Sequence, residues 1–386
     1  MARGRITKRE GKHGVSYDLV VEVGTDPLTG KRRRKVEAFR GTKKDAEKRL
    51  AELIRAVDTG SYCDPGKLTV ANYLRRWMDT HKVNLAPSTL RCYTVALDKH
   101  IIPGLGSAAL QKLTPIMIQE FYTRDLEGGR KDNKKSTGRG LSTTTVSMHH
   151  RILRKALADA VRWQMIARNP ADLVSPPKRA KKDITVPTEA EVKALLGAAQ
   201  GEYLHMPIYM AVYTGMRLGE VLGLRWEDVD LPNQVISVRQ SLYQRKQGDP
   251  LFKAPKTKGS TRTIDVGAAV VRALKAHKKE QSKQRMLAGQ MWQEYNLVCC
   301  LQNGQPIHPP TVGSRIRDLA NNLDAEFSFH DLRHFHASIL LKQGVHPKIV
   351  SERLGHSQIS ITMDTYSHLL PNVQRKAADL LDEALA

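Results

Sequence analysis

The sequence has few cysteines, few aromatic residues and no apolar run long enough to cross a bilayer. The four cysteines, Cys63, Cys92, Cys299 and Cys300, form no C-x-x-C pair, so no zinc site is expected. The adjacent Cys299 and Cys300 are expected to be core thiols, and the scarcity of cysteine fits a reducing cytoplasm. The basic N-terminus has no apolar stretch behind it, so no secretory signal peptide is expected. These absences predict a protein of the cytoplasm with no membrane partner.

Acidic residues are also scarce, because 39 Asp and Glu stand against 62 Lys and Arg, a net charge of +23. A uniformly basic surface repels itself, so this balance favours a polyanionic partner, and nucleic acid above all. The alternative is a ribosomal-type or merely solubilising surface. The hydrophobic content of 40% is enough for packed cores, and the 386-residue length suggests two or three domains.

The first 62 residues are expected to form a small β-sheet followed by one helix. Residues 15–23 alternate in part between apolar and polar side chains, as a half-buried strand does, and residues 31–39 read as a second strand. Thr42 is suited to cap a helix that begins at Lys43.

The second of these strands is strongly basic, which favours insertion into a DNA groove. The alternative is a solvated edge strand whose charge blocks aggregation. The DNA-binding candidates on the strand are Arg32, Arg33, Arg34 and Lys35.

Residues 67–175 have a helical pattern throughout and predict a basic module of four helices. Helix starts are expected at Pro87, at Thr114 and at Ser142. Residues 128–140 read as a polar, Gly-rich loop for which phosphate contact is plausible. His149 and His150 are expected at a helix surface or interface rather than as ligands.

Residues 176–185 read as a Pro-rich and basic linker, and Lys178 and Arg179 are candidates for contact with the DNA backbone. Thr188 and Glu191 have the spacing of a capping box, so a new and mainly helical domain is expected over residues 186–386.

An apolar helix before Gly215 is expected to break there, so that another begins near Arg217. Glu220 then lies on the same helical face as Arg217 and can orient a neighbouring side chain. Taken alone, an arginine such as Arg217 is more often an ordinary salt-bridge residue than a catalytic one.

Two alternating segments, residues 234–242 and 262–266, predict strands of a small antiparallel sheet. Lys256 and Lys258 lie between them. A lysine at a hairpin tip is able to protonate a leaving oxygen of DNA, or else to touch only the backbone.

Histidines, an arginine and a tyrosine lie close together in the C-terminal part of the sequence. They stand in residues 330–334 (HDLRH), in Leu354-Gly355-His356 and at Tyr366. Arginine and imidazole donors suit the non-bridging oxygens of a phosphodiester, and a tyrosine hydroxyl is able to attack its phosphorus. Helices are expected over residues 331–341, 345–354 and 357–366, with Ile361 and Met363 packed to hold Tyr366.

His330, His334 and His336 also suggest a metal site, because histidines four residues apart on a helix are able to share zinc. Arg333 stands among them, and no cysteine or Glu completes the set, so no metal and no cofactor are expected. His334 and His336 are interpreted as packing or supporting residues.

The ordered motifs resemble the tyrosine recombinase, or phage integrase, family. They are residues 214–220 (TGMRLGE), 255–258 (PKTK), 330–334 (HDLRH), 354–356 (LGH) and 364–366 (DTY). The resemblance implies a multidomain α+β fold with a small N-terminal sheet, a helical core-binding domain and a mainly helical catalytic domain with a small antiparallel sheet. The N-terminal sheet resembles the arm-binding domain of integrases.

The resemblance implies a role for each matching residue. Tyr366 would be the nucleophile that forms a 3′-phosphotyrosyl bond and frees a 5′ hydroxyl. Arg217 and Arg333 would clamp the scissile phosphate and stabilise the charge that builds on its oxygens.

The remaining matching residues would transfer protons, hydrogen-bond the phosphate or support the other side chains. His330 would assist proton transfer at the tyrosine, and His356 would hydrogen-bond the phosphate. Lys256 would be the general acid for the leaving 5′ oxygen, with Lys258 as the alternative. Glu220 would be a supporting carboxylate.

The resemblance further implies a homotetramer that integrates and excises a mobile element or prophage, acting on core and arm attachment sites in double-stranded DNA. A host DNA-bending protein and an excisionase are possible partners. Residues 372–386 would dock on a neighbouring protomer or on their own domain. A catalytically inactive DNA-binding regulator and a type IB topoisomerase are the alternatives.

Overall fold

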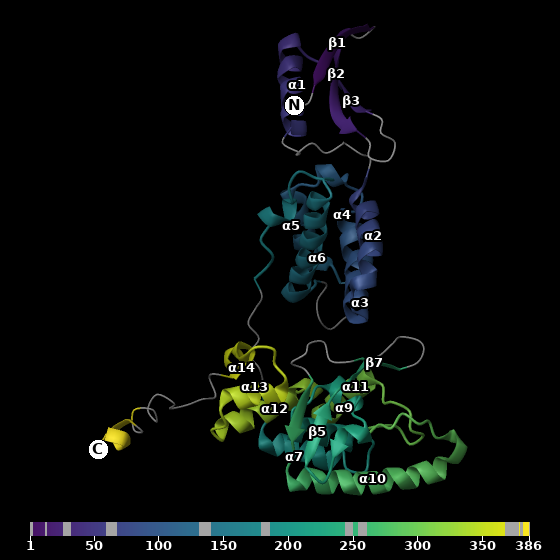
Figure 1. Cartoon of the computed structure of the whole chain (residues 1–386), viewed down its shortest axis with the longest axis vertical. Coiled ribbons are helices and arrows are strands. Elements are labelled where there is room, and N and C mark those ends of the chain that lie inside the picture. The colour runs from purple at the N-terminus through teal and green to yellow at the C-terminus, as the bar shows by residue number, and fades with distance from the viewer. Residues whose placement is uncertain are drawn as a thin grey trace. The chain divides into compact units, whose positions relative to one another are not determined.

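The structure is a computed structural model of the whole chain (Figure 1). It describes residues 3–11, 14–25, 32–58, 68–130, 140–178, 186–243, 250–253, 261–366, 378 and 381–385. Contacts divide the chain into two compact units, Met1–Lys181 and Lys182–Ala386. Of the helices in the described residues, none is long and apolar enough to cross a membrane.

The N-terminal region is a three-stranded antiparallel sheet, β1 (Gly4–Gly11), β2 (Gly14–Thr25) and β3 (Arg32–Phe39), covered by α1 (Lys43–Asp58). A small core joins sheet and helix, built from Tyr17, Leu19, Val21, Ala46 and Leu53. Thr42 caps α1 as predicted, because its hydroxyl accepts the main-chain N–H of Asp45 at 3.3 Å.

The sequence predicted β2, β3 and α1 but missed β1. Most residues of β1 are basic or polar, so the strand shows no alternation of apolar and polar side chains. Ile6 stands opposite Leu19 on β2 and packs against the small core. Pairing with β2 supplies the stability that the local pattern of β1 does not indicate.

The helical region contains α2 (Val70–His81), α3 (Pro87–Ala96), α4 (Ile102–Leu105), α5 (Pro115–Gly128) and α6 (Thr143–Arg162). A π-helical turn, Leu97–Ile101, joins α3 to α4. Short 3-10 turns are Lys82–Asn84, Leu110–Lys112 and Pro170–Leu173. The predicted helix starts are confirmed, since Thr114 and Ser142 accept main-chain N–H groups and Pro87 is the first residue of α3.

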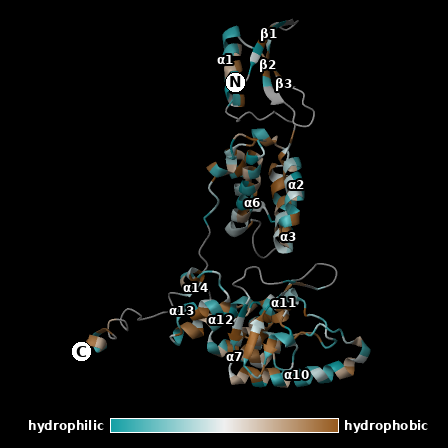
Figure 2. Cartoon of the chain, in the orientation of Figure 1, coloured by the Kyte–Doolittle hydropathy of each residue, from teal (hydrophilic) through white to brown (hydrophobic). Residues whose placement is uncertain are grey.

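One apolar core holds these helices together, with Trp77 and Tyr73 of α2 fully buried beside Phe121 of α5 and Leu153 of α6. Apolar and polar residues alternate around α2 and α3, as expected of helices with one buried face (Figure 2). His149 and His150 are neither ligands nor surface residues. They are buried at the interface of α5 and α6, where His149 contacts Asp125 and His150 contacts Tyr122.

The second unit begins with α7 (Glu189–Ala198), α8 (His205–Thr214) and α9 (Leu218–Leu222). The strands are β4 (Val229–Asp230), β5 (Val235–Val238), β6 (Ser241–Tyr243), β7 (Leu251–Lys253) and β8 (Arg262–Asp265). The helices that follow are α10 (Ala268–Ala288), α11 (Pro309–Asn321), α12 (Phe329–Lys342), α13 (Pro347–Leu354) and α14 (Ile359–Tyr366). Short 3-10 turns are Trp226–Asp228 and Gly289–Met291.

Thr188 and Glu191 form the predicted capping box at the start of α7. The strands make two antiparallel sheets, one ordered β4-β5-β8 and the other β6-β7. The predicted strand over residues 234–242 is therefore two strands in different sheets, and β7, with three residues, is too short to show alternation. Ile236 and Ile264 bury one face of the larger sheet against Leu274 of α10 and Leu332 of α12.

The expectation that Ile361 and Met363 hold Tyr366 is wrong. Their side chains flank the buried face of α14 and are 42% and 36% exposed, whereas Thr362 and Tyr366 are buried. Tyr366 packs in a small cluster with α12 and α13 that includes Leu341 and Leu354. The helix itself was predicted correctly, but Ile361 and Met363 are two residues apart and cannot share one helical face, whereas the buried Thr362 and Tyr366 are four apart and do.

Candidate functional site

The site is built around the break between α8 and α9. Gly215 ends α8 in the left-handed conformation, with φ of 66°. A Cβ at this position would lie 2.7 Å from Cδ2 of His336, so both the backbone and the space require glycine. The break leaves Arg217 at the N-cap of α9, as the sequence predicted.

Arg217 is held by the buried carboxylate of Glu220. Its Nη1 donates to Oε1 of Glu220 at 2.9 Å, and its main-chain N–H donates to Oε2 at 2.9 Å. Its Nη2 donates to the carbonyl of Gly355 at 3.3 Å, and 39% of the side chain remains exposed. Burial opposes the charged form of Glu220, but hydrogen bonds and the charges of Arg262 and Arg217 outweigh it, so its pKa is lowered.

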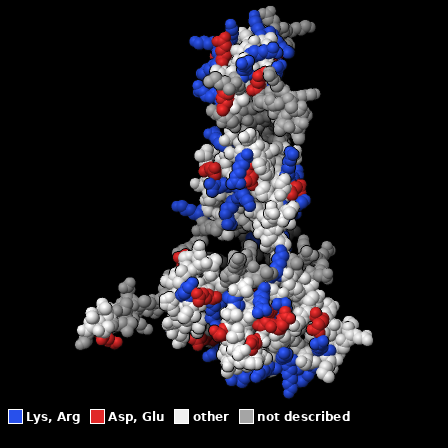
Figure 3. All heavy atoms as spheres, in the orientation of Figure 1, with Lys and Arg blue, Asp and Glu red and all other residues white. Residues whose placement is uncertain are grey.

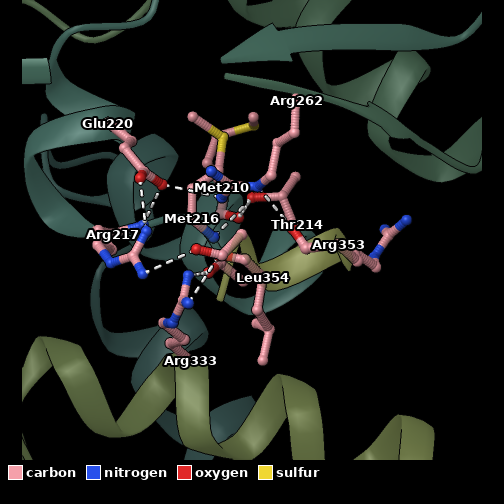
Figure 4. Close-up of polar contacts among 11 residues, drawn as sticks. Met210, Thr214, Met216, Arg217, Glu220, Arg262, Arg333, Arg353 and Leu354 are labelled. Carbon is pink, nitrogen blue, oxygen red and sulfur yellow. Dashed lines mark hydrogen bonds and ion pairs between the residues drawn. The ribbon is translucent and has the colours of Figure 1, made fainter. Parts of the chain in front are cut away.

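Arg333 of α12 lies on the other side of this break and is 2% exposed. It donates to the carbonyls of Gly215 and Leu354, each at 2.7 Å, so it ties α8 to the end of α13 (Figure 4). Burial and then the charge of Arg217 lower its pKa. A guanidinium nevertheless stays charged at neutral pH, so the interior of the site carries a positive charge.

Tyr366 is 2% exposed, and its hydroxyl lies 2.6 Å from Nδ1 of His334. Burial raises the pKa of Tyr366 to about 12, although Arg333 opposes the shift. The rings of His330 and His334 meet edge to face at 4.9 Å. The expected supporting residue His334, rather than His330, therefore contacts the hydroxyl.

The histidines around the site are kept neutral. Loss of surrounding water and then the charge of Arg333 lower the pKa of His330. Burial and then His330 lower that of His334. For His356, burial and then Arg333 lower the pKa to about 4, and its Nδ1 lies 2.8 Å from the hydroxyl of Thr362.

His336 has a structural position, as expected. Its Nδ1 lies 2.9 Å from the carbonyl of Val212, and its Nε2 accepts Nε–H of Arg353 at 3.1 Å. Both ring nitrogens are therefore engaged, and a metal ion shared with His334 does not fit these contacts. Among the described residues, no group of three potential ligands is placed to hold a metal.

Several residues that the sequence predicts to contact DNA are described only in part or not at all. Lys256, Lys258 and Arg179 lie outside the described residues, and the side chains of the basic strand β3 are described only in part. Arg34 of that strand is 55% exposed and lies 3.5 Å from Glu22. Lys178 is exposed. Basic side chains lie on the visible face of both units, interspersed with acidic ones (Figure 3).

Sequence reasoning missed Arg262, which contacts the site from β8. Its Nη2 donates to Oε2 of Glu220 at 2.9 Å, and its Nε donates to the carbonyl of Arg353 at 2.7 Å. Near Arg262, the sequence shows only an arginine at the start of an expected strand. This arrangement is common and does not indicate a site residue. The contact partners are 42 and 91 residues away in sequence, so no local pattern reveals them.

The arrangement combines fixed guanidinium groups, neutral imidazoles and a buried phenol. Guanidinium groups bind phosphate oxygens and stabilise charge that develops on them. A phenol beside neutral imidazoles has an acceptor for its proton. The site is thus suited to transfer of a phosphoryl group to Tyr366.

Comparisons with known proteins agree with this chemistry. Residues 186–372 match the phage integrase family, and residues 69–124 match the phage integrase N-terminal SAM-like domain. A tyrosine recombinase XerC-like protein of Caldanaerobacter subterraneus subsp. tengcongensis is 27% identical over 95% of this chain and 96% of its own. The ICEBs1 integrase of Bacillus subtilis is 27% identical over 96% of this chain and 97% of its own.

Solved structures share the fold. The Tn1549 transposon integrase in complex with transposon right-end DNA is 22% identical, with a TM-score of 0.68 over 82% of this chain and 100% of that chain. A lambda integrase tetramer bound to a Holliday junction is 18% identical, with a TM-score of 0.57 over 91% of this chain and 92% of that chain.

Proposed function

The chain belongs to the phage integrase family of tyrosine recombinases, and we propose that it recombines specific DNA sites with Tyr366 as its nucleophile. The phenolic oxygen attacks the scissile phosphorus, the bond to the 5′ oxygen breaks, and a 3′-phosphotyrosyl bond and a free 5′ hydroxyl result. Attack by a 5′ hydroxyl reverses these steps and rejoins DNA. Because the phosphotyrosyl bond replaces the phosphodiester, neither ATP nor a metal is needed.

The observation that carries the proposal is that Arg333 lies close enough to both Arg217 and the buried phenol of Tyr366 for their charges to interact. Arg333 is buried on two main-chain carbonyls, which are neutral acceptors, and Arg217 is partly exposed beside it. Among the described residues, the carboxylate of Glu220 contacts both Arg217 and Arg262. The remaining positive charge favours a phosphate, and it favours the more negative transition state further.

The proton of Tyr366 has an acceptor in place. In the tautomer that carries its proton on Nε2, the neutral ring of His334 presents Nδ1 as an acceptor at 2.6 Å from the hydroxyl. His330 assists the transfer through its edge-to-face contact with His334. Since the pKa of Tyr366 is raised to about 12, proton removal must accompany attack rather than precede it.

The proposed role of His356 is to donate a hydrogen bond to the phosphate. A neutral imidazole has one N–H, so His356 is able to donate through Nε2 only if Thr362 donates to its Nδ1. Lys256 is proposed as the general acid that protonates the leaving 5′ oxygen, with Lys258 as the alternative. Glu220 supports Arg217.

Each proposed domain has its own role. Residues 1–62 bind arm sites through β3 and its residues Arg32, Arg33, Arg34 and Lys35. Residues 67–175 bind core DNA, the linker 176–185 follows the backbone through Lys178 and Arg179, and residues 186–386 are catalytic. A homotetramer would join two sites during integration and excision of a mobile element, helped by a host DNA-bending protein and an excisionase.

The proposal is tested by trapping the covalent intermediate. The protein is incubated with sheared genomic DNA of its source, and DNA bound after denaturation is sequenced to locate the cleaved site. A duplex with that site and a nick a few nucleotides beyond the scissile phosphate loses its short 5′-hydroxyl fragment after cleavage, so the adduct accumulates.

Wild-type protein should give an adduct on a denaturing gel, and Tyr366→Phe should give none while still binding the duplex. Tyr243→Phe serves as the matched control, because Tyr243 lies on β6 and is not among the proposed site residues. An adduct that persists in Tyr366→Phe would contradict the assignment. Relaxation of plasmids that lack the site would instead favour a type IB topoisomerase.

A further inference from the structure

Three consecutive carbonyls at the end of α13 each accept a hydrogen bond from a different arginine (Figure 4). Arg262 donates to residue 353 at 2.7 Å, Arg333 to residue 354 at 2.7 Å and Arg217 to residue 355 at 3.3 Å. The last carbonyls of a helix have no partner within it and carry its negative dipole end. This helix end therefore fixes the guanidinium groups of three separate elements, β8, α12 and the start of α9.

Arg262 differs from Arg217 in its burial and from Arg333 in its carboxylate partner. Like Arg217, it joins this helix end to Glu220, but its side chain is 6% exposed against 39% for Arg217, and its Nη2 donates to Oε2 whereas the guanidinium of Arg217 donates to Oε1. Arg262 thus fixes both groups that hold Arg217: the carboxylate of Glu220, which it contacts directly, and the turn that presents the carbonyl of Gly355.

Gly355 makes this arrangement possible. It adopts φ of 67°, and a Cβ at this position would lie 2.9 Å from Nη1 and 3.1 Å from Cδ of Arg262. Glycine is required by the left-handed turn and by the close approach of the arginine. The turn and Arg262 therefore depend on each other.

We propose that Arg262 is a positioning residue, which acts on the scissile phosphate only through the orientation of Arg217 that it imposes. The proposal rests on the proposed function, because Arg217 is there a clamp on the phosphate. Displacement of a catalytic group by about 1 Å is sufficient to slow a reaction by roughly 10²-fold.

The test compares single-turnover cleavage of the nicked duplex by wild-type protein, Arg262→Gln and Arg262→Lys. Arg262→Gln should slow adduct formation about 10²-fold at saturating DNA while the Kd for DNA stays within about threefold. Arg262→Lys should be intermediate, because one ammonium keeps the ion pair with Glu220 but lacks the planar fork that spans both partners. Arg262→Lys carries the test if Arg262→Gln does not fold.

A double-variant cycle separates positioning from a general loss of structure. In an Arg217→Ala background, Arg262→Gln should slow cleavage by less than about threefold more, because its effect passes through the missing side chain. Arg285→Gln is the matched control: Arg285 is 61% exposed, lies 2.6 Å from Glu294 and has no place in the site. Independent, multiplicative effects, or an Arg262→Gln rate within threefold of wild type, would overturn the proposal.

A second readout does not depend on catalysis. Phenylglyoxal modifies accessible arginines, and peptide mass spectrometry gives its rate at Arg217. Arg262→Gln should raise this rate severalfold, and Arg285→Gln should leave it unchanged; an unchanged rate in Arg262→Gln would contradict the inference. If wild-type protein formed no adduct, the proposed function would fail, and this measurement would still decide whether Arg262 positions Arg217.

Discussion

The two units both bury charged groups, but they balance the charge differently. In the helical region, Asp125 lies 2.8 Å from Nδ1 of His149, and Asp159 accepts Nε1–H of Trp77 at 2.8 Å and lies 3.2 Å from His81. Each buried carboxylate thus has donor partners within the same fold. Such groups stabilise the packing of helices that they join.

In the second unit the balance is incomplete. Arg333 is buried on carbonyls, and Arg217 and Arg262 share one carboxylate. Carbonyls satisfy hydrogen bonds but leave the net charge in place. The difference teaches that paired polar groups hold a structure, whereas an excess of one charge in a buried site indicates a ligand of the opposite charge.

The largest effect is expected from Arg333→Lys. A lysine lacks the planar fork that spans the carbonyls of Gly215 and Leu354, so the clamp on the phosphate is lost. Single-turnover cleavage of the nicked duplex should fall about 10³-fold, with little change in DNA affinity. A fall of less than tenfold would show that the excess charge serves another purpose.

Burial of His336, together with the positive charges beside it, should make stability depend on pH. Burial lowers its pKa to about 4, and Arg353 and Arg333 add to the shift. Above pH 6.5 the ring is neutral in both states; below it the unfolded chain takes up a proton first. The free energy of unfolding should therefore fall by about 3 kcal/mol between pH 6.5 and 4 on account of this residue.

Urea unfolding at pH 7 and pH 4.5 measures this loss against His336→Asn, whose amide still donates to the carbonyl of Val212 but does not titrate in this range. As the pH falls, the free energy of unfolding of the wild type should decrease more than that of the variant. A difference that stays constant with pH would refute the assignment to His336.

In the helical region, Asp125→Ala should lower stability rather than the rate of cleavage. It leaves His149 buried without its partner, which costs about 2 kcal/mol in the free energy of unfolding. Asp79→Ala is the control, because Asp79 is 69% exposed in its pair with Lys82 and should cost less than about 1 kcal/mol. Urea denaturation measures both losses in the free energy of unfolding. Equal losses for Asp125→Ala and Asp79→Ala would contradict the contrast between the two units.

The smallest effect is expected from Thr362→Val, which removes the hydroxyl beside His356 but keeps the shape. Without a donor at Nδ1, the ring is free to place its single proton there and lose the bond to the phosphate. Cleavage should slow about tenfold, as expected for one hydrogen bond to a charged group, and Thr362→Ser should retain the wild-type rate. Equal rates for both variants would exclude a role of this hydroxyl in fixing the tautomer.

Features with a local cause could be predicted from the sequence. The capping box at Thr188 and the helix ends at Gly215 and Gly355 arise from groups a few residues apart. The order of the motifs placed Arg217, Arg333 and residues 354–356 in one site, and hydrogen bonds do bring these residues together.

Features that depend on distant neighbours could not be predicted. β1 is stabilised by pairing with β2, and the buried face of α14 is chosen by α12 and α13. The contact of His334 with Tyr366 and those of Arg262 join elements far apart in sequence. Periodicity locates a helix, but it does not say which neighbour covers which face.

The most direct test of the central claim is tandem mass spectrometry of the trapped protein–DNA adduct after digestion by a protease and a nuclease. The account predicts a nucleotide joined through its 3′ phosphate to the peptide that contains Tyr366, with the mass difference on that residue. A nucleotide attached to any other residue, or through a 5′ phosphate, would contradict it.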